Sequence, residues 1–237
     1  STSLYAYLHE INTIDQRILT AEEPIEYEME GVNQLLVRPD IGLPFAKALR
    51  SFLRQDPDII MVGEIRDLET AEISIQASLT GHLVFSTLHT NDAAGAFTRL
   101  LDMGVEPYLV ASAVEAVVAQ RLVRKLCIDC RATAEADTAM LQEIGFPVER
   151  LDRERVYASA GCESCRNTGF RGRNGIFEVL RCNDAIESLI ITRSAANEIK
   201  QQAIRDGMRT LRDDGWDKVL NGVTTVEEVL RVSEEND

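Results

Sequence analysis

An unbroken apolar run near position 60 is the clearest feature of the hydrophobic pattern. Within residues 58–62, four apolar side chains follow one another, with a Pro turn before them and a glycine after them. Strands covered on both faces show such runs, so the pattern predicts the central strand of a parallel sheet. Glu64, Arg66 and Asp67 follow at the carboxyl end, where open parallel sheets bind their ligands. The alternative is a buried strand whose exit, meaning the polar residues directly after its carboxyl end, only caps the next helix.

Strands and helices alternate along the first half of the chain. Further strands are predicted over residues 17–21, 35–37 and 82–87. The spacing of apolar residues predicts helices over residues 1–12, 45–53, 68–80, 92–103 and 108–120. This alternation is typical of an α/β fold with a mostly parallel sheet. Right-handed crossovers would bring the carboxyl ends of its strands to one edge.

Polar side chains follow three of these strands where each one ends. Glu22, Glu23 and Glu26 come after the first strand, and such a cluster is repulsive unless it holds a cation or a proton. The exit after residues 82–87 carries Thr87, His89 and Asp92. Carboxylates, hydroxyls and an imidazole on one sheet edge predict a catalytic crevice. A solvated acidic turn remains the alternative for the first cluster.

Two arginines lie one helical turn apart at the end of the helix over 45–53. Residues four apart share one side of a helix, so Arg50 and Arg54 would present two guanidinium groups together. A solvated helix face is the commoner explanation, and binding of an anion is the alternative.

Two C-x-x-C pairs dominate the second half of the chain. Cys127 with Cys130 and Cys162 with Cys165 can complete a tetrahedron around zinc, with Zn–S distances near 2.3 Å. Four thiolates leave no open position, so the pattern predicts a structural zinc site. Thiol–disulfide chemistry is the competing interpretation. Cys182 stands apart and is interpreted as a buried structural thiol.

The rest of the chain reads as one strand followed by short helices. A turn over residues 170–175 leads into a strand over 176–180. Helices are predicted over 184–192, 195–207, 210–220 and 226–232, the last with a capping box of Thr225 and Glu228. The expected organisation is an α/β core over residues 1–122, a zinc subdomain over 123–172 and a strand-and-helix subdomain over 173–237.

Composition narrows the classes of function. The 237 residues carry a net charge of −14, whereas a nucleic-acid-binding surface favours the opposite sign. No run of about 18 apolar residues and no signal peptide is visible. The pairing of the cysteines favours metal binding in a reducing compartment. Because the chain opens on Ser-Thr-Ser without Met, we expect a fragment of a longer protein.

The order of these motifs resembles one family. Ser-Thr-Ser-Leu-Tyr-Ala, Ala-Glu-Glu-Pro-Ile-Glu-Tyr, Asp-Pro-Asp-Ile-Ile-Met-Val-Gly-Glu-Ile-Arg-Asp and Gly-His-Leu-Val-Phe-Ser-Thr-Leu-His-Thr-Asn-Asp-Ala follow one another, before the cysteine pairs and Gly-Phe-Arg-Gly-Arg-Asn-Gly. The whole chain is thereby similar to the secretion or traffic ATPases, the type II secretion ATPases most closely and the type IV pilus assembly ATPases next.

The resemblance implies a fold, cofactors and partners. It implies a RecA-like P-loop core that binds ATP and Mg²⁺, a Zn²⁺ site and a homo-hexamer. It also implies a place at the cytoplasmic face of the inner membrane, through platform proteins that meet a preceding part of the protein, and no nucleic-acid partner. Ser1 matches the last position of the phosphate loop G-x-x-x-x-G-K-[ST], so the chain is expected to begin inside this motif and, alone, to bind nucleotide poorly.

The resemblance also implies roles for individual residues. Ser1 would bind Mg²⁺ and Thr2 a phosphate, while Glu64 would be the catalytic glutamate. The acidic cluster that helps to hold Mg²⁺ would comprise Glu22, Glu23 and Glu26. The other implied residues are the histidines His82 and His89, the arginines Arg50, Arg54, Arg66 and Arg99 at phosphates or subunit boundaries, and Arg171 and Arg173 near the nucleotide.

Three functions stay open from the sequence. The first is the ATPase motor of a type II secretion system, which would power pseudopilus assembly and protein export. The second is a type IV pilus assembly ATPase, which shares these motifs, whereas the pilus-retraction relatives lack the cysteine pairs. The third is a zinc-stapled docking module that is inactive for lack of its phosphate loop.

Overall fold

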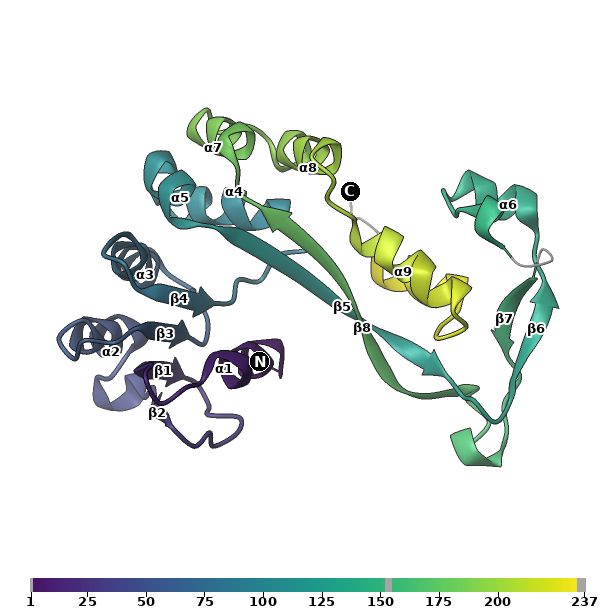
Figure 1. Ribbon diagram of the computed structural model, residues 1–237, viewed down its shortest axis with the longest axis horizontal. Helices are drawn as coiled ribbons and strands as arrows, with labels where there is room; N and C mark the ends of the chain where they lie inside the picture. Colours follow the sequence, from purple (N-terminus) through teal and green to yellow (C-terminus); the bar gives the residue numbers. More distant parts are fainter. Residues whose placement is uncertain (1, 152–154, 234–237) are drawn as a thin grey trace. The chain divides into compact units, whose positions relative to one another are not determined.

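The structure is a computed structural model that describes residues 2–151 and 155–233 (Figure 1). The chain divides into two compact units. The first unit contains the residues up to Thr90, together with Ala94–Glu115 and Cys182–Ile199. The second unit contains Asn91–Ala93, Ala116–Arg181 and the residues from Lys200 onward. Three consecutive residues after the fourth strand therefore belong to the second unit before the chain returns to the first.

A parallel sheet forms the centre of the first unit. Its strands lie in the order β2 (Val32–Leu36), β1 (Ile18–Glu22), β3 (Ile59–Val62) and β4 (Leu83–Ser86). All three neighbouring pairs are parallel. The residues of β1 and β3 are buried throughout, as the apolar run near position 60 indicated. The predicted α/β class with a mostly parallel sheet is confirmed.

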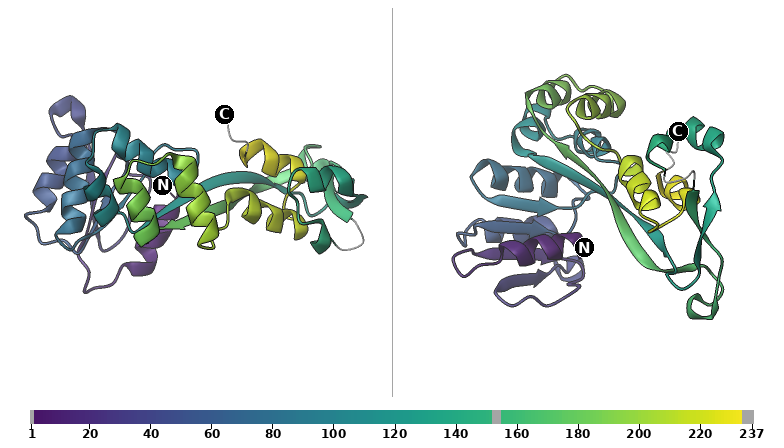
Figure 2. Two further views of the ribbon diagram at one scale, coloured as in Figure 1. Left: turned by 90° about the horizontal axis from the view of Figure 1, so that it is seen from above. Right: turned by 45° about the vertical axis from the view of Figure 1, so that its right-hand side comes forward.

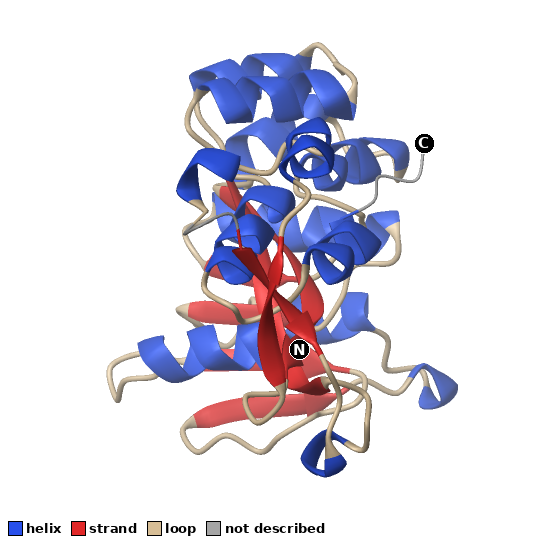
Figure 3. Ribbon diagram, turned by 90° about the vertical axis from the view of Figure 1, so that its right-hand side faces the viewer, coloured by secondary structure: helices blue, strands red, loops and turns tan. Residues whose placement is uncertain are grey.

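Helices cover both faces of this sheet. On one face, Leu8 of α1 (Thr2–Ile11) packs in a cluster with Ile18, Ile59 and Met61. Side chains alternate along a strand, so Ile60 and Val62 lie on the opposite face. There α2 (Phe45–Phe52) contacts β1 and α3 (Leu68–Leu79) contacts β4. Figure 2 shows these helices beside the strands in the colours of Figure 1, and Figure 3 distinguishes helices from strands by colour. The other α-helices of the first unit are α4 (Ala94–Asp102), α5 (Pro107–Ala113), α7 (Asp184–Ile191) and the first residues of α8 (Ala196–Arg205). Helix α7 packs on α5.

Three of the predicted elements are wrong in type or extent, and one of them is the turn over residues 170–175, which lies inside strand β8 (Phe170–Arg181). The helix predicted over residues 108–120 ends at Ala113, and Ala116–Leu126 forms strand β5. The β-branched Val117 and Val118 favour a strand. The strand predicted over residues 35–37 instead spans Val32–Leu36, where Asn33 and Gln34 interrupt the apolar pattern.

Two antiparallel ribbons form the strands of the second unit. Strand β5 pairs with β8 (Phe170–Arg181), whose second half includes the strand predicted over residues 176–180. Strand β6 (Arg131–Glu135) pairs with β7 (Arg155–Ser159). Short helices complete the unit: α6 (Thr138–Glu143), α9 (Leu211–Leu220) and α10 (Val226–Ser233).

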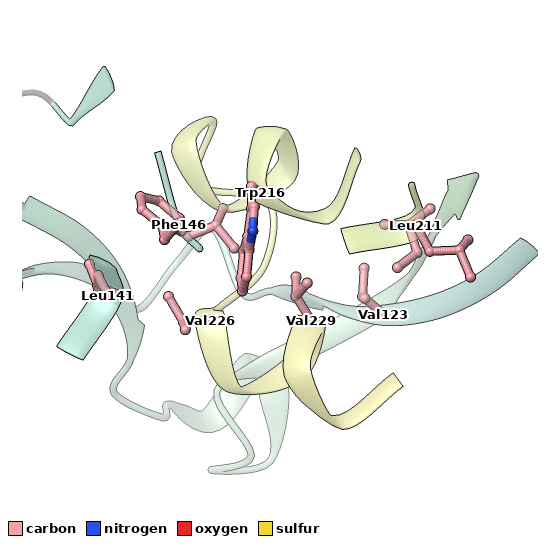
Figure 4. Close-up of a cluster of buried hydrophobic side chains, with 9 residues drawn as sticks. Val123, Leu141, Phe146, Leu211, Trp216, Val226 and Val229 are labelled. Atoms are coloured by element: carbon pink, nitrogen blue, oxygen red, sulfur yellow. The ribbon is translucent and has the colours of Figure 1, made fainter. Parts of the chain in front are cut away.

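An apolar core holds these elements together (Figure 4). Trp216 of α9 packs edge-to-face on Phe146, with 5.2 Å between ring centroids. A Cβ on Gly215 would lie only 2.5 Å from Val229, so this glycine inside a helix permits close packing of α9 on α10. The described residues contain no helix with the length and hydropathy of a membrane span. The three-part division at residues 122/123 and 172/173 stays a prediction.

Candidate active site and candidate metal centre

The carboxyl ends of β1, β3 and β4 meet at one edge of the sheet. The amide of Gly63 donates to the Ala21 carbonyl at 2.8 Å, and the amide of Ile65 donates to the Thr87 carbonyl at 3.0 Å. The Thr87 hydroxyl donates to the Gly63 carbonyl at 2.7 Å. A Cβ on Gly63 would lie 3.3 Å from the Ala21 carbonyl oxygen, so glycine suits this crowded exit. The three predicted strand exits are therefore neighbours.

Glu64 is held between two cationic or polar partners at this edge. Its Oε1 lies 2.5 Å from an Arg66 guanidinium nitrogen, and its Oε2 lies 3.1 Å from His89 Nε2. The side chain of Glu64 is 15% exposed. The hydrogen bond from Arg66 lowers the pKa of Glu64, against the effect of burial. An ionised, oriented carboxylate at a strand end can accept a proton or a hydrogen bond from a water molecule.

The acidic cluster after β1 has two environments. The Glu22 side chain is buried, and its oxygens accept hydrogen bonds from Thr20, Gln34 and Tyr5. Glu23 is exposed and lies 3.4 Å from Arg66. Arg66 thus joins the exits of β1 and β3.

The acids of this cluster do not form a compact metal cage. Among the residues that the structure describes, the four cysteines are the one group of three or more His, Cys, Asp or Glu side chains close enough to share an ion. The oxygen donors of Glu22, Glu23 and Glu26 suit Mg²⁺, which keeps several water ligands and needs only one or two carboxylates.

Other predicted residues lie away from Glu64 within this unit. His82 precedes β4, whereas His89 follows it, so about four residues of strand, roughly 13 Å, separate their backbones along the sheet. The His82 ring instead lies 2.9 Å from the Ala77 carbonyl oxygen. Arg50 pairs with Glu69 at 2.6 Å and thereby links α2 to α3. Arg54 and Arg99 are exposed.

The remaining predicted nucleotide-binding residues stay predictions. Thr2 is exposed at the first position of α1. Ser1, the predicted Mg²⁺ ligand, lies outside the described residues. Arg171 and Arg173 are exposed on β8 of the second unit.

The sequence pattern did not reveal Tyr5, Thr20 and Gln34 as site residues. Tyr5 occupies an apolar position of the α1 face. Gln34 lies in strand β2, where Asn33 and Gln34 interrupt the apolar pattern that predicts a strand. Their contacts with Glu22 join positions 17 and 12 residues apart for Tyr5 and Gln34. No local spacing reports such contacts.

The four paired cysteines gather in the second unit. Three of the six sulfur–sulfur distances are 3.9 Å for Cys127–Cys162, 3.8 Å for Cys130–Cys165 and 3.7 Å for Cys162–Cys165, and all four sulfur atoms lie within 4.8 Å of one another. A tetrahedron with Zn–S bonds of about 2.3 Å has edges of about 3.8 Å. The amides of Cys162 and Gly169 each donate to Cys165 Sγ at 3.2 Å, which favours a thiolate. The arrangement therefore fits a tetrahedral metal ion.

The fifth cysteine has a different environment. Cys182 belongs to the first unit, apart in sequence from both pairs. Burial raises its pKa to about 11, so the thiol stays protonated near neutral pH. Cys182 is partly and not fully buried, and its interpretation as a structural thiol stays a prediction.

The first unit is an α/β core with a parallel sheet and a carboxylate after its central strand, and solved structures of ATPases have the same fold. A solved structure of the pilus retraction motor PilT with bound ADP matches it with a TM-score of 0.71 and 29% identity, over 99% of this chain and 58% of that one. The DotB ATPase of Yersinia pseudotuberculosis has the same fold, with a TM-score of 0.71 and 20% identity over 98% of this chain and 54% of that one.

The family assignment follows from the sequence comparisons. The chain belongs to the type II/IV secretion system protein family, whose model matches residues 1–231. The type II secretion system protein E of Aeromonas hydrophila is 52% identical over 100% of this chain and 46% of its own length. The type IV pilus assembly ATPase PilB of Myxococcus xanthus is 51% identical over 97% of this chain and 41% of its own length. The resemblance to the secretion ATPases is confirmed, and the chain spans less than half the length of these relatives.

Proposed function

We propose that the protein containing this chain is the ATPase motor of a bacterial type II secretion system, which hydrolyses ATP to power pseudopilus assembly and protein export. The observation that carries the proposal is the carboxylate of Glu64, fixed between Arg66 and His89 at the edge where three parallel strands end. The similarity to type II secretion proteins E over the whole chain supports it.

Glu64 is assigned the role of the group that orients and polarises the attacking water. Its pKa is lowered by Arg66, so the carboxylate is ionised near neutral pH and can accept a hydrogen bond from water. Arg66 also approaches Glu23, so its charge offsets both acids. Phosphoryl transfer depends mainly on such positioning and charge.

The other predicted site residues would contact Mg²⁺, the phosphates of ATP or a neighbouring subunit. Bound Mg²⁺ would neutralise charge on the phosphates, and Glu22, Glu23 and Glu26 would hold its water ligands. Ser1 and Thr2 would contact Mg²⁺ and phosphate at the start of α1. Arg50, Arg54 and Arg99 would act at phosphates or at subunit boundaries of a homo-hexamer. His82 and His89 would sense the γ-phosphate, and Arg171 and Arg173 would lie near the nucleotide.

The four paired cysteines are assigned a structural zinc ion. Their sulfur–sulfur distances match a tetrahedral site, and four thiolates leave no position for a reacting molecule. Zinc would join the connection between β5 and β6, which carries Cys127 and Cys130, to the connection between β7 and β8, which carries Cys162 and Cys165.

The motor would lie at the cytoplasmic face of the inner membrane, bound to platform proteins and not to nucleic acid. The net charge of −14 agrees with a protein partner more than with a phosphate backbone. Residues 1–237 alone are proposed not to turn over ATP, since they include no G-x-x-x-x-G-K.

Type IV pilus assembly is the second candidate, because PilB of Myxococcus xanthus is almost as similar as protein E of Aeromonas hydrophila. Deletion of the gene in its host separates the two. Loss of secreted enzymes with surface pili intact would support type II secretion, whereas loss of pili with secretion intact would support pilus assembly. A normal phenotype for both would contradict both motors and leave the docking module.

A further inference from the structure

The buried carboxylate of Glu22 is the centre of a hydrogen-bond network that joins α1, β1 and β2. Glu22 is the last residue of β1 and its side chain is buried. Thr20 donates to Oε1 at 2.6 Å, Gln34 donates to the same oxygen at 3.1 Å, and the Tyr5 hydroxyl donates to Oε2. A buried charge is tolerated when its oxygens are bonded in this way.

Tyr5 connects this carboxylate to the acidic segment after β1. Its hydroxyl accepts hydrogen bonds from the amides of Glu26 at 3.1 Å and Tyr27 at 3.3 Å. Burial and the bond to Glu22 raise the pKa of Tyr5, so the phenol keeps its proton and remains a donor. The Tyr27 ring packs edge-to-face on the Tyr5 ring, at 5.3 Å between centroids. One side chain of α1 therefore fixes Glu22 and the backbone beside Glu26.

Gln34 holds the same segment from the other side. Its Nε2 donates to the Tyr27 carbonyl at 2.8 Å as well as to Glu22, and its Oε1 accepts from the Met29 amide at 2.8 Å. Gln34 lies on β2, next to β1 in the sheet. The amide thus spans from the carboxylate to the loop between the two strands.

The network leaves Glu22 with limited capacity for a further partner. A carboxylate offers about four acceptor positions, and three side chains occupy three of them. One position remains for a water molecule or a hydrated cation. Without the two donors from α1 and β2, the carboxylate could rotate, and the loop that carries Glu26 would lose its anchors.

We propose that Tyr5 and Gln34 are positioning residues for the ATPase reaction, which orient Glu22 and the following acidic segment toward hydrated Mg²⁺. This inference rests on the proposed ATPase function. It assigns Tyr5 and Gln34 an effect on metal use and turnover, and not only on stability.

The test uses Tyr5→Phe and Gln34→Leu in the full-length protein, with ATP turnover measured against ATP and against Mg²⁺. The Mg²⁺ dependence of nucleotide binding is measured separately by equilibrium titration, and its midpoint should shift with that of turnover. Each substitution nearly preserves side-chain volume and removes donors to Glu22. We expect kcat to fall about tenfold and the Mg²⁺ concentration for half-maximal rate to rise several-fold, with KM for ATP changed less than twofold. Because both residues act through Glu22, the double variant should lose less than the product of the single losses.

Tyr7→Phe is the matched control. Tyr7 lies on the same helix, is 40% exposed, and its ring stacks on Phe85. We expect this variant to keep the wild-type kcat and Mg²⁺ dependence. Urea titration of each variant measures stability separately, since loss of folded protein lowers the rate without moving the Mg²⁺ midpoint.

Wild-type kcat and an unchanged Mg²⁺ midpoint in both folded variants would overturn the positioning role and leave the ATPase function standing. If Tyr5→Phe does not fold, Gln34→Leu alone decides in the same way. A full-length wild-type protein without ATP turnover would overturn the proposed function, and the positioning role with it.

Discussion

Glu228 provides a quantitative test of how the second unit is held together. Its carboxylate is buried and accepts hydrogen bonds from the Arg124 amide at 3.0 Å and the Arg124 guanidinium at 2.6 Å. Arg231 donates two more, at 3.0 and 2.9 Å. Glu228 thus ties α10 to β5. The substitution Glu228→Gln removes the charge with little change of volume.

The expected loss follows from the acid–base behaviour of Glu228. Burial alone would raise its pKa, but the bonds from Arg231 and Arg124 outweigh burial and lower the pKa from 4.5 to about 2. A shift of about 2.5 units corresponds to at most about 3.4 kcal/mol. The side chains of Arg124 and Arg231 are 51% and 57% exposed, so water screens part of this energy. We expect Glu228→Gln to lower the free energy of unfolding by about 2 kcal/mol at pH 7.

The effect must depend on pH with a definite sign. The folded-state pKa lies below the unfolded one, so the contribution is complete above about pH 5 and is lost as the pH falls toward 2. The assay is urea unfolding at pH 7 and pH 3, followed by fluorescence of Trp216, the single tryptophan of the sequence and part of the same core.

Glu227→Gln is the matched control, because Glu227 is the exposed neighbour on the same helix. Each variant is compared with wild type at the same pH, so general acid effects and metal loss cancel. Equal stability of the two variants at pH 7 would refute the reasoning. A difference between them that persists unchanged at pH 3 would refute the electrostatic origin.

Two further outcomes test the metal centre and the active site. We expect about one zinc per chain by elemental analysis, lost in Cys130→Ser together with a lower Tm; no metal and four freely titratable thiols would contradict the zinc site. We expect Arg66→Gln to lower kcat about tenfold or more, because a charge-assisted hydrogen bond to Glu64 contributes about 1.5–3 kcal/mol. Arg38→Gln is the control. It breaks only the exposed pair with Asp40 and should leave kcat unchanged. Equal rates for the two arginine variants would remove Arg66 from the site.

Local patterns were sufficient for the elements that carry the chemistry. The apolar run of β3 needs no distant information, because both faces of that strand are covered by helices. The parallel alternation then brings the exits of β1, β3 and β4 together. The C-x-x-C spacing likewise predicted that the four sulfur atoms lie together, and they are within 4.8 Å of one another.

Local sequence patterns could not predict contacts between residues that lie far apart in the sequence. Residues 116–120 were predicted to continue the preceding helix, but pairing with β8 makes them part of strand β5. In the capping box predicted for α10, the Thr225 hydroxyl accepts from the Glu228 amide at 3.4 Å, while the Glu228 carboxylate binds Arg124, about a hundred residues earlier. His82 and His89 look like one motif in sequence, yet the length of β4 separates them. In each case a tertiary partner decides the outcome.

ATP turnover by the Glu64→Gln variant of the full-length protein tests the central claim most directly. The variant is compared with wild type and with Glu72→Gln, an exposed glutamate on α3, by measuring steady-state hydrolysis and nucleotide binding on the same samples. We expect Glu64→Gln to lower kcat by about 10²–10⁴ while ATP still binds, and Glu72→Gln to match wild type. Wild-type turnover by Glu64→Gln would contradict the assignment of this carboxylate to the reaction.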